Sequence, residues 1–74
     1  DATMTSELIG RTGVVTLGIG GGESLGEVEL AMALGTERFL ARCATPVATD
    51  ETVLVVGVSP GRIVDVEPWV AMPT

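Results

Sequence analysis

The sequence contains few side chains that could take part in catalysis or metal binding. It has one cysteine, Cys43, and neither histidine nor lysine. A serine or cysteine nucleophile needs an adjacent base, and a structural zinc site needs several thiolate or imidazole ligands. The alternation of apolar residues directs Cys43 inward, so we interpret it as an inert core thiol. These residues predict a protein that is not an enzyme and uses no metal or cofactor.

Two glutamates have the spacing of a carboxylate pair. Glu27 and Glu29 are two positions apart, which on a β-strand places both side chains on one face. Glycosidases use paired carboxylates as acid and nucleophile. Alternating acidic residues are also typical of the solvent-exposed face of a strand, and we prefer this interpretation.

A glycine-rich stretch, LGIGGGESLG at residues 17–26, raises the question of phosphate binding. The dinucleotide motif GxGxxG does not fit, because Glu23 or Leu25 occupies the position of its last glycine. The P-loop motif requires a lysine, and no amphipathic helix follows the stretch. We therefore expect a mobile loop without bound phosphate, because glycine loses more conformational entropy on ordering than other residues do.

The composition indicates one small domain with an acidic surface. The 74 residues are 46% hydrophobic, with one Phe, one Trp and no Tyr, and the formal net charge is −6. A negative charge opposes binding to the phosphates of nucleic acids. No apolar run approaches the ~18 residues that span a bilayer. Because the chain begins with Asp1 rather than Met, we expect it to be an excised domain or a processed product.

Alternating apolar residues predict five β-strands. The stretch TPVATDET at residues 45–52 has room for a loop or one helical turn, and SPGR at residues 59–62 predicts a turn. Gly57, inside an apolar run, predicts a bulge or a tight bend. Five short strands hide their edges most simply by closing, so we expect an all-β fold, a small five-stranded antiparallel barrel that is OB-fold-like. The predicted strands are 11–17, 26–34, 37–44, 52–59 and 62–69, and the barrel spans 9–70 between a flexible N-terminal segment, 1–8, and a C-terminal tail, 71–74.

The second and third predicted strands form a hairpin whose register depends on its turn. With Gly35 and Thr36 as a two-residue loop, Met32 faces Phe39 and Glu29 faces Arg42. The core side of this hairpin then consists of Val28, Leu30, Met32, Phe39, Ala41 and Cys43. Its outer side consists of Glu27, Glu29, Arg38, Leu40 and Arg42.

The order of these segments resembles the soluble C-terminal domain of the NfeD-like membrane protein family. The similar motifs are LIGRTG at residues 8–13, VLVVGV at 53–58 and VDVEP at 64–68. GIGGGES makes the first loop longer than the family pattern, and TPVATDET lacks a glycine that the family often has there. The resemblance implies an OB-fold domain tethered to a membrane through segments outside this chain. The sequence leaves the membrane side open, and we expect the cytoplasmic side. It also implies a non-catalytic interaction module, an adaptor or scaffold, that acts with stomatin- or flotillin-like membrane proteins.

The outer side of the hairpin is the candidate partner surface. OB-folds bind nucleic acids or oligosaccharides on the face of strands two and three, and this alternative function stays open. The chain has no aromatic platform there and the wrong net charge for nucleic acid, so we expect a protein partner and no nucleic acid. For Trp69 the sequence leaves two alternatives, an exposed anchor or a plug in the mouth of the barrel, and we expect the plug. The oligomeric state is also left open. The candidate surface residues are Glu29, Arg38, Leu40, Arg42 and Trp69.

Overall fold

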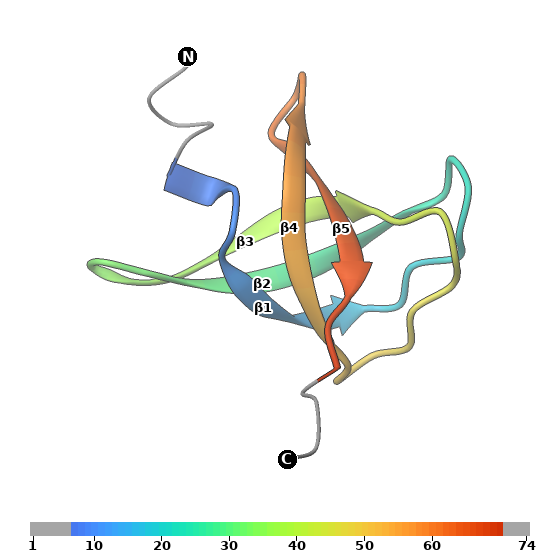
Figure 1. The fold of residues 1–74 in the computed structure, drawn as a ribbon, viewed down its shortest axis with the longest axis horizontal. Helices are drawn as coiled ribbons and strands as arrows, with labels where there is room; N and C mark the ends of the chain where they lie inside the picture. Colours follow the sequence, from blue (N-terminus) through green and yellow to red (C-terminus); the bar gives the residue numbers. More distant parts are fainter. Residues whose placement is uncertain (1–6, 71–74) are drawn as a thin grey trace.

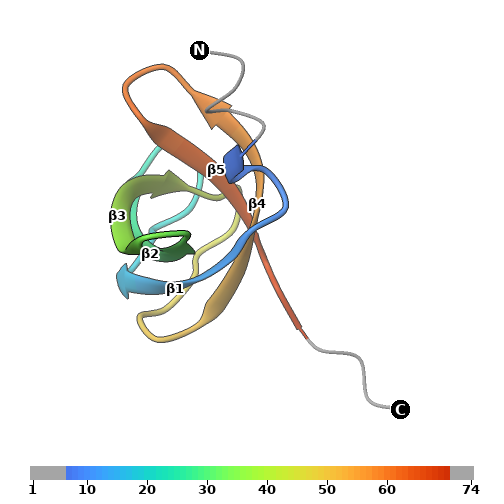
Figure 2. The ribbon, with the colours of Figure 1, turned by 90° about the vertical axis from the view of Figure 1, so that its left-hand side faces the viewer.

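The structure is a computed structural model that describes residues 7–70 (Figure 1). Five strands form a closed barrel in the order β1-β2-β3-β5-β4, which confirms the predicted all-β, five-stranded barrel. Seen from the side, β4 and β5 form one wall, and β2 and β3 form the other (Figure 2). The strands are β1 (Thr12–Leu17), β2 (Leu25–Met32), β3 (Gly35–Arg42), β4 (Thr52–Ser59) and β5 (Ile63–Pro68).

One seam of the barrel is parallel rather than antiparallel. β3 pairs with β5 in parallel over three residue pairs, whereas β1–β2, β2–β3, β1–β4 and β4–β5 are antiparallel. The connection after β3 crosses the barrel, so β5 rather than β4 lies beside β3. The strand orientation is therefore mixed, and this seam differs from the antiparallel pairing that we expected.

The core consists largely of β-branched aliphatic side chains from alternate strand positions. This alternation explains why the sequence forms strands, because β-branched residues pack well on a pleated surface that is buried on one face. The predicted core residues of the hairpin are buried, except that Met32 is partly buried at the edge of the core. The core comprises Leu8, Val15, Ile19, Val28, Leu30, Phe39, Ala41, Cys43, Val47, Val53, Val55, Val64 and Val66.

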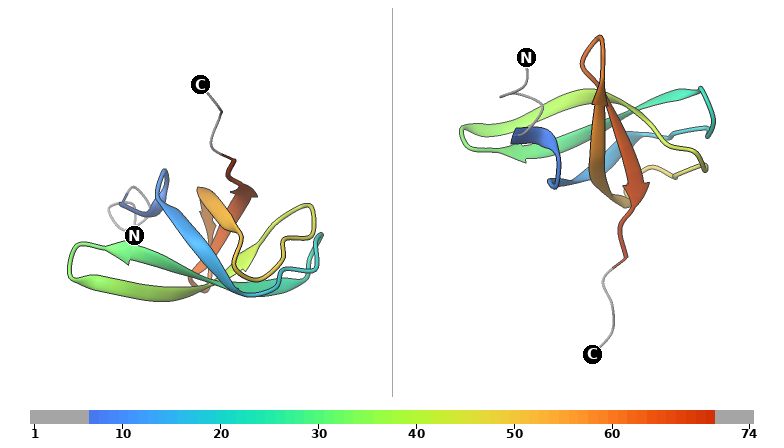
Figure 3. Two further views of the ribbon diagram at one scale, coloured as in Figure 1. Left: turned by 90° about the horizontal axis from the view of Figure 1, so that it is seen from below. Right: turned by 45° about the horizontal axis from the view of Figure 1, so that its top comes forward.

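Residues outside the strands contribute to both ends of the barrel (Figure 3). Leu8, in a helical turn before β1, is only 2% exposed, although we had placed it in a flexible segment. At the other end, Ile19 and Val47 come from two different loops and are also buried. The connection between β3 and β4 is a loop without a helical turn. Residues 1–6 and 71–74, which include most of the predicted N-terminal segment and the predicted tail, lie outside the described residues.

The glycine-rich loop is fixed in place by its single isoleucine. Ile19 and Val47 exchange two backbone hydrogen bonds of 2.9 Å, which join this loop to the β3–β4 loop. Gly26 allows the loop to lie against β2, because a Cβ at this position would meet the carbonyl oxygen of Gly18 at 2.7 Å. The expectation of a mobile loop is wrong at Ile19: a buried apolar side chain compensates for the entropy lost by the glycines.

The β2–β3 register differs from the prediction by a shift of the turn. Met32 pairs with Gly35 and Glu29 pairs with Arg38, so Ala33 and Leu34 form the turn. Gly35 has a φ of 125°, and it follows the turn rather than beginning it. The predicted pairs of Met32 with Phe39 and of Glu29 with Arg42 are therefore wrong. The shift moves the partners by an even number of residues, so the inner and outer faces are as predicted.

The β4–β5 hairpin contains both predicted irregularities. Ser59 pairs with Ile63, which leaves a three-residue loop in which Gly61 has a φ of 88°. The β4–β5 register shifts between Val55 and Gly57, as expected for a bulge at this glycine.

Candidate protein-interaction surface

Three cross-strand pairs of outward-facing side chains lie where β2 and β3 form part of the barrel wall, and a fourth pair, Ala31 with Thr36, lies nearer the tip of the hairpin. Leu25 pairs with Arg42, Glu27 with Leu40, and Glu29 with Arg38. Four of these six residues, Glu29, Arg38, Leu40 and Arg42, are predicted partner-surface residues. We call this surface the β2–β3 outer face, and it consists of Leu25, Glu27, Glu29, Arg38, Leu40 and Arg42.

Arg38 is loosely held on this face. Its guanidinium lies 3.8 Å from a Glu27 carboxylate oxygen and 3.7 Å from one of Glu29, and its side chain is 63% exposed. Glu27 has a shorter contact, because it accepts a hydrogen bond of 2.8 Å from the hydroxyl of Thr16 on β1. Exposed pairs with such long contacts contribute little to stability. The Arg38 cation is therefore available to a binding partner.

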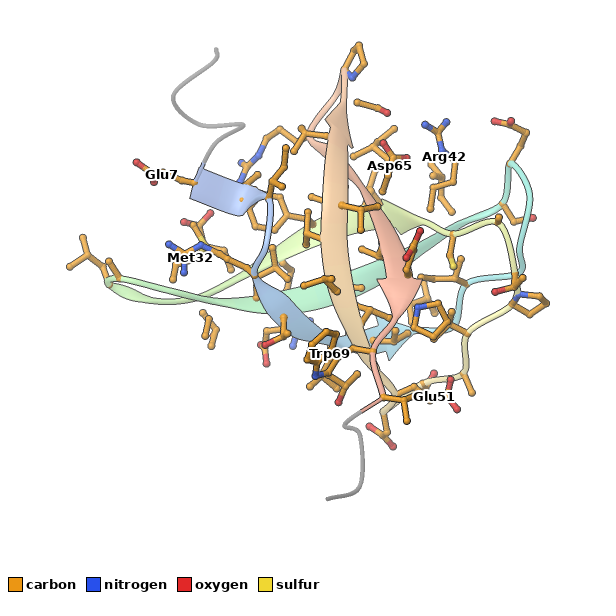
Figure 4. All side chains as sticks on the ribbon, viewed as in Figure 1. Glu7, Met32, Arg42, Glu51, Asp65 and Trp69 are labelled. Atoms are coloured by element: carbon orange, nitrogen blue, oxygen red, sulfur yellow. The ribbon has the colours of Figure 1, made fainter. Side chains whose placement is uncertain are left out.

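Arg42, in contrast, is bound within the domain (Figure 4). Its Nε and Nη2 donate to Asp65 Oδ1 at 3.1 and 2.9 Å, and Nη2 also donates to the Ser59 hydroxyl at 2.8 Å. That hydroxyl donates to the other Asp65 oxygen at 2.8 Å. The network connects β3, β4 and β5 at the parallel seam, so Arg42 is a structural residue as well as a surface residue. This network could not be predicted from the sequence, because Arg42 and Asp65 become neighbours only through the crossover.

Two leucines give the face its apolar area. Leu40 is 45% exposed, and Leu25, which is 43% exposed, is its diagonal neighbour across the hairpin. The predicted second strand begins at Gly26 and omits Leu25, whereas β2 begins at Leu25. Its alternation with Glu27 and Glu29 was the signal that could have identified it.

Trp69 lies apart from Arg42, at the other end of β5 from the Ser59–Ile63 turn (Figure 4). It directly follows β5, and its backbone N–H donates to the carbonyl of Thr52 at the start of β4. Two strands separate Trp69 from the outer face, because Thr52 on β4 pairs with Val14 on β1, and Val14 pairs with Glu29 on β2. The Trp69 side chain is 48% exposed, so it does not plug the barrel.

The outer face has no aromatic side chain among its six residues. Phe39 on β3 points inward and is 4% exposed. Its ring is covered by the Arg62 guanidinium, whose central carbon lies 4.8 Å from the ring centroid. A face without aromatic side chains lacks the base-stacking platform of single-stranded nucleic-acid sites.

A groove of about 840 Å³ borders the outer face at Arg42. Its lining includes three acidic residues, Glu23, Asp65 and Glu67, and the thiol-bearing residue Cys43, which is buried as predicted. Within residues 7–70, no group of three or more His, Cys, Asp or Glu side chains is placed to hold a metal ion. In the same range, no helix has the length and apolar character needed to cross a bilayer.

Comparison with known proteins identifies the family. The barrel is similar to the solution structure of the soluble domain of the NfeD protein YuaF from Bacillus subtilis, with a TM-score of 0.76. The two chains are 24% identical, and the alignment covers 96% of this chain and 88% of that one, so the likeness shows the fold. No curated protein matches the sequence. Residues 12–67, which include all but one residue of the five strands, match the NfeD C-terminal domain, and the chain therefore belongs to the NfeD C-terminal domain family.

Proposed function

We propose that this domain is a non-catalytic protein-interaction module of a membrane-tethered NfeD-like protein. Its partner is a stomatin- or flotillin-like membrane protein, as the family resemblance implies, and we place the domain on the cytoplasmic side. The partner binds the β2–β3 outer face, where it buries Leu25 and Leu40 and pairs an acidic group with Arg38.

The exposed leucine pair is the observation that carries this proposal. Leu25 and Leu40 are each more than two-fifths exposed on a face that otherwise carries charged residues. An apolar centre within a polar rim is typical of protein interfaces. Arg38 adds a cation that is only weakly paired, and arginine can bind a carboxylate through two parallel hydrogen bonds. Arg42 is bound to Asp65 within the domain, so we do not propose it as an anchor for the partner.

A double variant, Arg38→Glu with Leu40→Ser, tests the proposal. The binding measurement uses the full-length protein and the purified stomatin-like protein of the same organism, both reconstituted in vesicles. We expect the variant to weaken binding by at least about tenfold, because it removes one charged and one apolar anchor. The isolated domain should keep its fold, as its amide NMR spectrum would show.

A matched control removes an equally exposed apolar side chain elsewhere. Val56 on β4 is 43% exposed and lies outside the outer face, so Val56→Ser should leave the affinity unchanged. Unaltered binding by the Arg38→Glu, Leu40→Ser variant would move the interface away from this face. Trp69, the remaining predicted anchor, would then be the next residue to substitute.

A further inference from the structure

The tip of the β2–β3 hairpin extends beyond the rest of the barrel (Figure 3). β3 pairs with β5 only from Leu40 onward, whereas β2 pairs with β3 along its whole length. Within residues 7–70, the segment 35–39 of β3 therefore has a strand neighbour on one side only. We call the other side of residues 35–39 the free β3 edge.

Hydrogen bonding shows which backbone groups point out of this edge. In an antiparallel pair, successive residues alternately direct their N–H and C=O groups toward the partner strand and away from it. The Ala31 carbonyl accepts a hydrogen bond of 2.9 Å from the Arg11 side chain, so it points away from β3. Ala31 is paired with Thr36, whose backbone groups consequently point away from β2. Arg38 lies two residues further along and has the same orientation.

The free β3 edge therefore presents four outward backbone groups, the N–H and C=O of Thr36 and of Arg38. None of them has a backbone partner among residues 7–70. Proteins usually protect such edges with proline, bulges or covering segments, because an open edge can pair with another chain. Residues 35–39 contain no proline, and their pairing with β2 has no bulge.

We propose that the free β3 edge binds an extended, acidic segment of the partner protein, which adds to the barrel as a further strand. Main-chain hydrogen bonds to Thr36 and Arg38 hold such a segment, as in other cases of strand addition. This deepens the proposed function and rests on it, because it specifies how the partner binds beside the outer face.

Arg38 favours an acidic segment at this edge, because it projects on the outer side and makes only long contacts with Glu27 and Glu29. Arg62 lies at the inner side, where its guanidinium is already bound to Glu37 at 3.1 Å and covers Phe39. Both arginine side chains are 63% exposed. A second copy of this chain fits less well, because a twofold antiparallel pairing of two such edges about Glu37 would place the two glutamates opposite each other.

A peptide titration tests strand addition without the natural partner. The probes are the capped peptide acetyl-SVEVTS-amide and the same peptide with lysine in place of glutamate. We expect saturable NMR shifts and slower amide exchange at Thr36 and Arg38 with the first peptide, and weaker binding of the second. An absence of saturable shifts at these two amides would refute the proposal. Shifts at Leu25 and Leu40 with unchanged exchange at Thr36 would also refute it, since they indicate binding to the face alone.

A proline substitution then tests the same edge in the protein. Thr36→Pro removes an outward N–H, and proline is tolerated on edge strands where this group faces solvent. Thr36→Val is the matched control, because it keeps the N–H and the shape of the side chain. We expect Thr36→Pro to lose binding of the peptide and of the stomatin-like partner, and Thr36→Val to keep both. If Thr36→Pro does not fold, the peptide can be changed instead of the protein. N-methylation at its second valine removes a backbone N–H donor from the peptide, and this peptide should bind more weakly.

The two proposals fail in different ways. If Thr36→Pro binds the partner as well as Thr36→Val does, while Arg38→Glu with Leu40→Ser weakens binding, strand addition is wrong and the outer face stands. If the wild-type protein does not bind the stomatin-like partner, the proposed function is wrong, and the peptide titration still decides whether the edge accepts a strand.

Discussion

Replacing Arg42 with methionine removes the guanidinium from the junction of β3, β4 and β5 while keeping an apolar stem of similar length. The substitution breaks three hydrogen bonds of 2.8–3.1 Å, two to Asp65 and one to Ser59. The Asp65 side chain is 32% exposed, so water can replace part of what is lost. We expect the free energy of unfolding to fall by about 1–2 kcal/mol. This loss lies between the contribution of an exposed ion pair and that of a buried hydrogen bond to a charged group.

Arg38→Met is the matched control on the same face. Arg38 has only long contacts with Glu27 and Glu29, so its loss should change the free energy of unfolding by less than about 0.5 kcal/mol. Urea unfolding followed by circular dichroism measures both variants. In a domain of this size each 1 kcal/mol corresponds to roughly 4–8 °C in Tm, so thermal unfolding gives an independent measurement. Equal losses for the two variants would show that the Arg42 network does not stabilise the barrel.

A double-mutant cycle with Asp65→Asn isolates the Arg42 interaction. The Arg42→Met and Asp65→Asn effects should be non-additive by about 1 kcal/mol, because both substitutions break the same contact. Additive effects would indicate that each substitution acts through other contacts, and the network would then have no stability of its own.

Three further outcomes are expected. Gly26→Ala should cost about 2–3 kcal/mol of stability, because its Cβ would collide with backbone oxygens of residues 17 and 18. Gly22→Ala, which has open space but a φ of 58°, should cost only about 1 kcal/mol, and equal costs in chemical denaturation would contradict the close approach at Gly26. Ile19→Ala should cost about 2–4 kcal/mol of stability, because it leaves a cavity in the core, whereas Leu17→Ala, at a 61% exposed position, should be nearly neutral in the same measurement. A neutral Ile19→Ala would mean that this side chain does not hold the loop. Trp69 fluorescence should be quenched by iodide in the folded domain, because the side chain is 48% exposed, and strong protection would restore the interpretation of a buried plug.

The strand faces could be predicted from the sequence because they depend only on a period of two. Val28, Leu30, Phe39 and Ala41 are buried as expected, although the register that joined them was wrong. The register depends on which turn position a glycine occupies. Gly35 suits either the first position of a two-residue turn or the position after the turn, and sequence alone does not separate these alternatives.

Contacts between segments that are distant in the sequence could not be predicted. Ile19 and Val47 lie in two loops without a strand pattern, and their backbone pairing depends on the shape of the closed barrel. The contact of Arg42 with Asp65 depends on the β3–β5 seam, which we expected to be antiparallel like the others. In both cases the local sequence pattern is that of solvent-exposed chain. The strand order of the closed barrel is needed to show that these residues contact each other.

The fixed position of Arg42 changes what the surface can offer to a partner. Because Asp65 and Ser59 already occupy its guanidinium, the cation available on the outer face is that of Arg38, at the end of the face next to the free β3 edge. Arg38 thus contributes its side chain to the face and its backbone groups to the edge. Arg38→Met removes only the first contribution and Thr36→Pro acts only on the second, so a comparison of their effects on partner binding separates side-chain recognition from strand addition. If the partner uses both, each variant should weaken binding, and their combination should weaken it further.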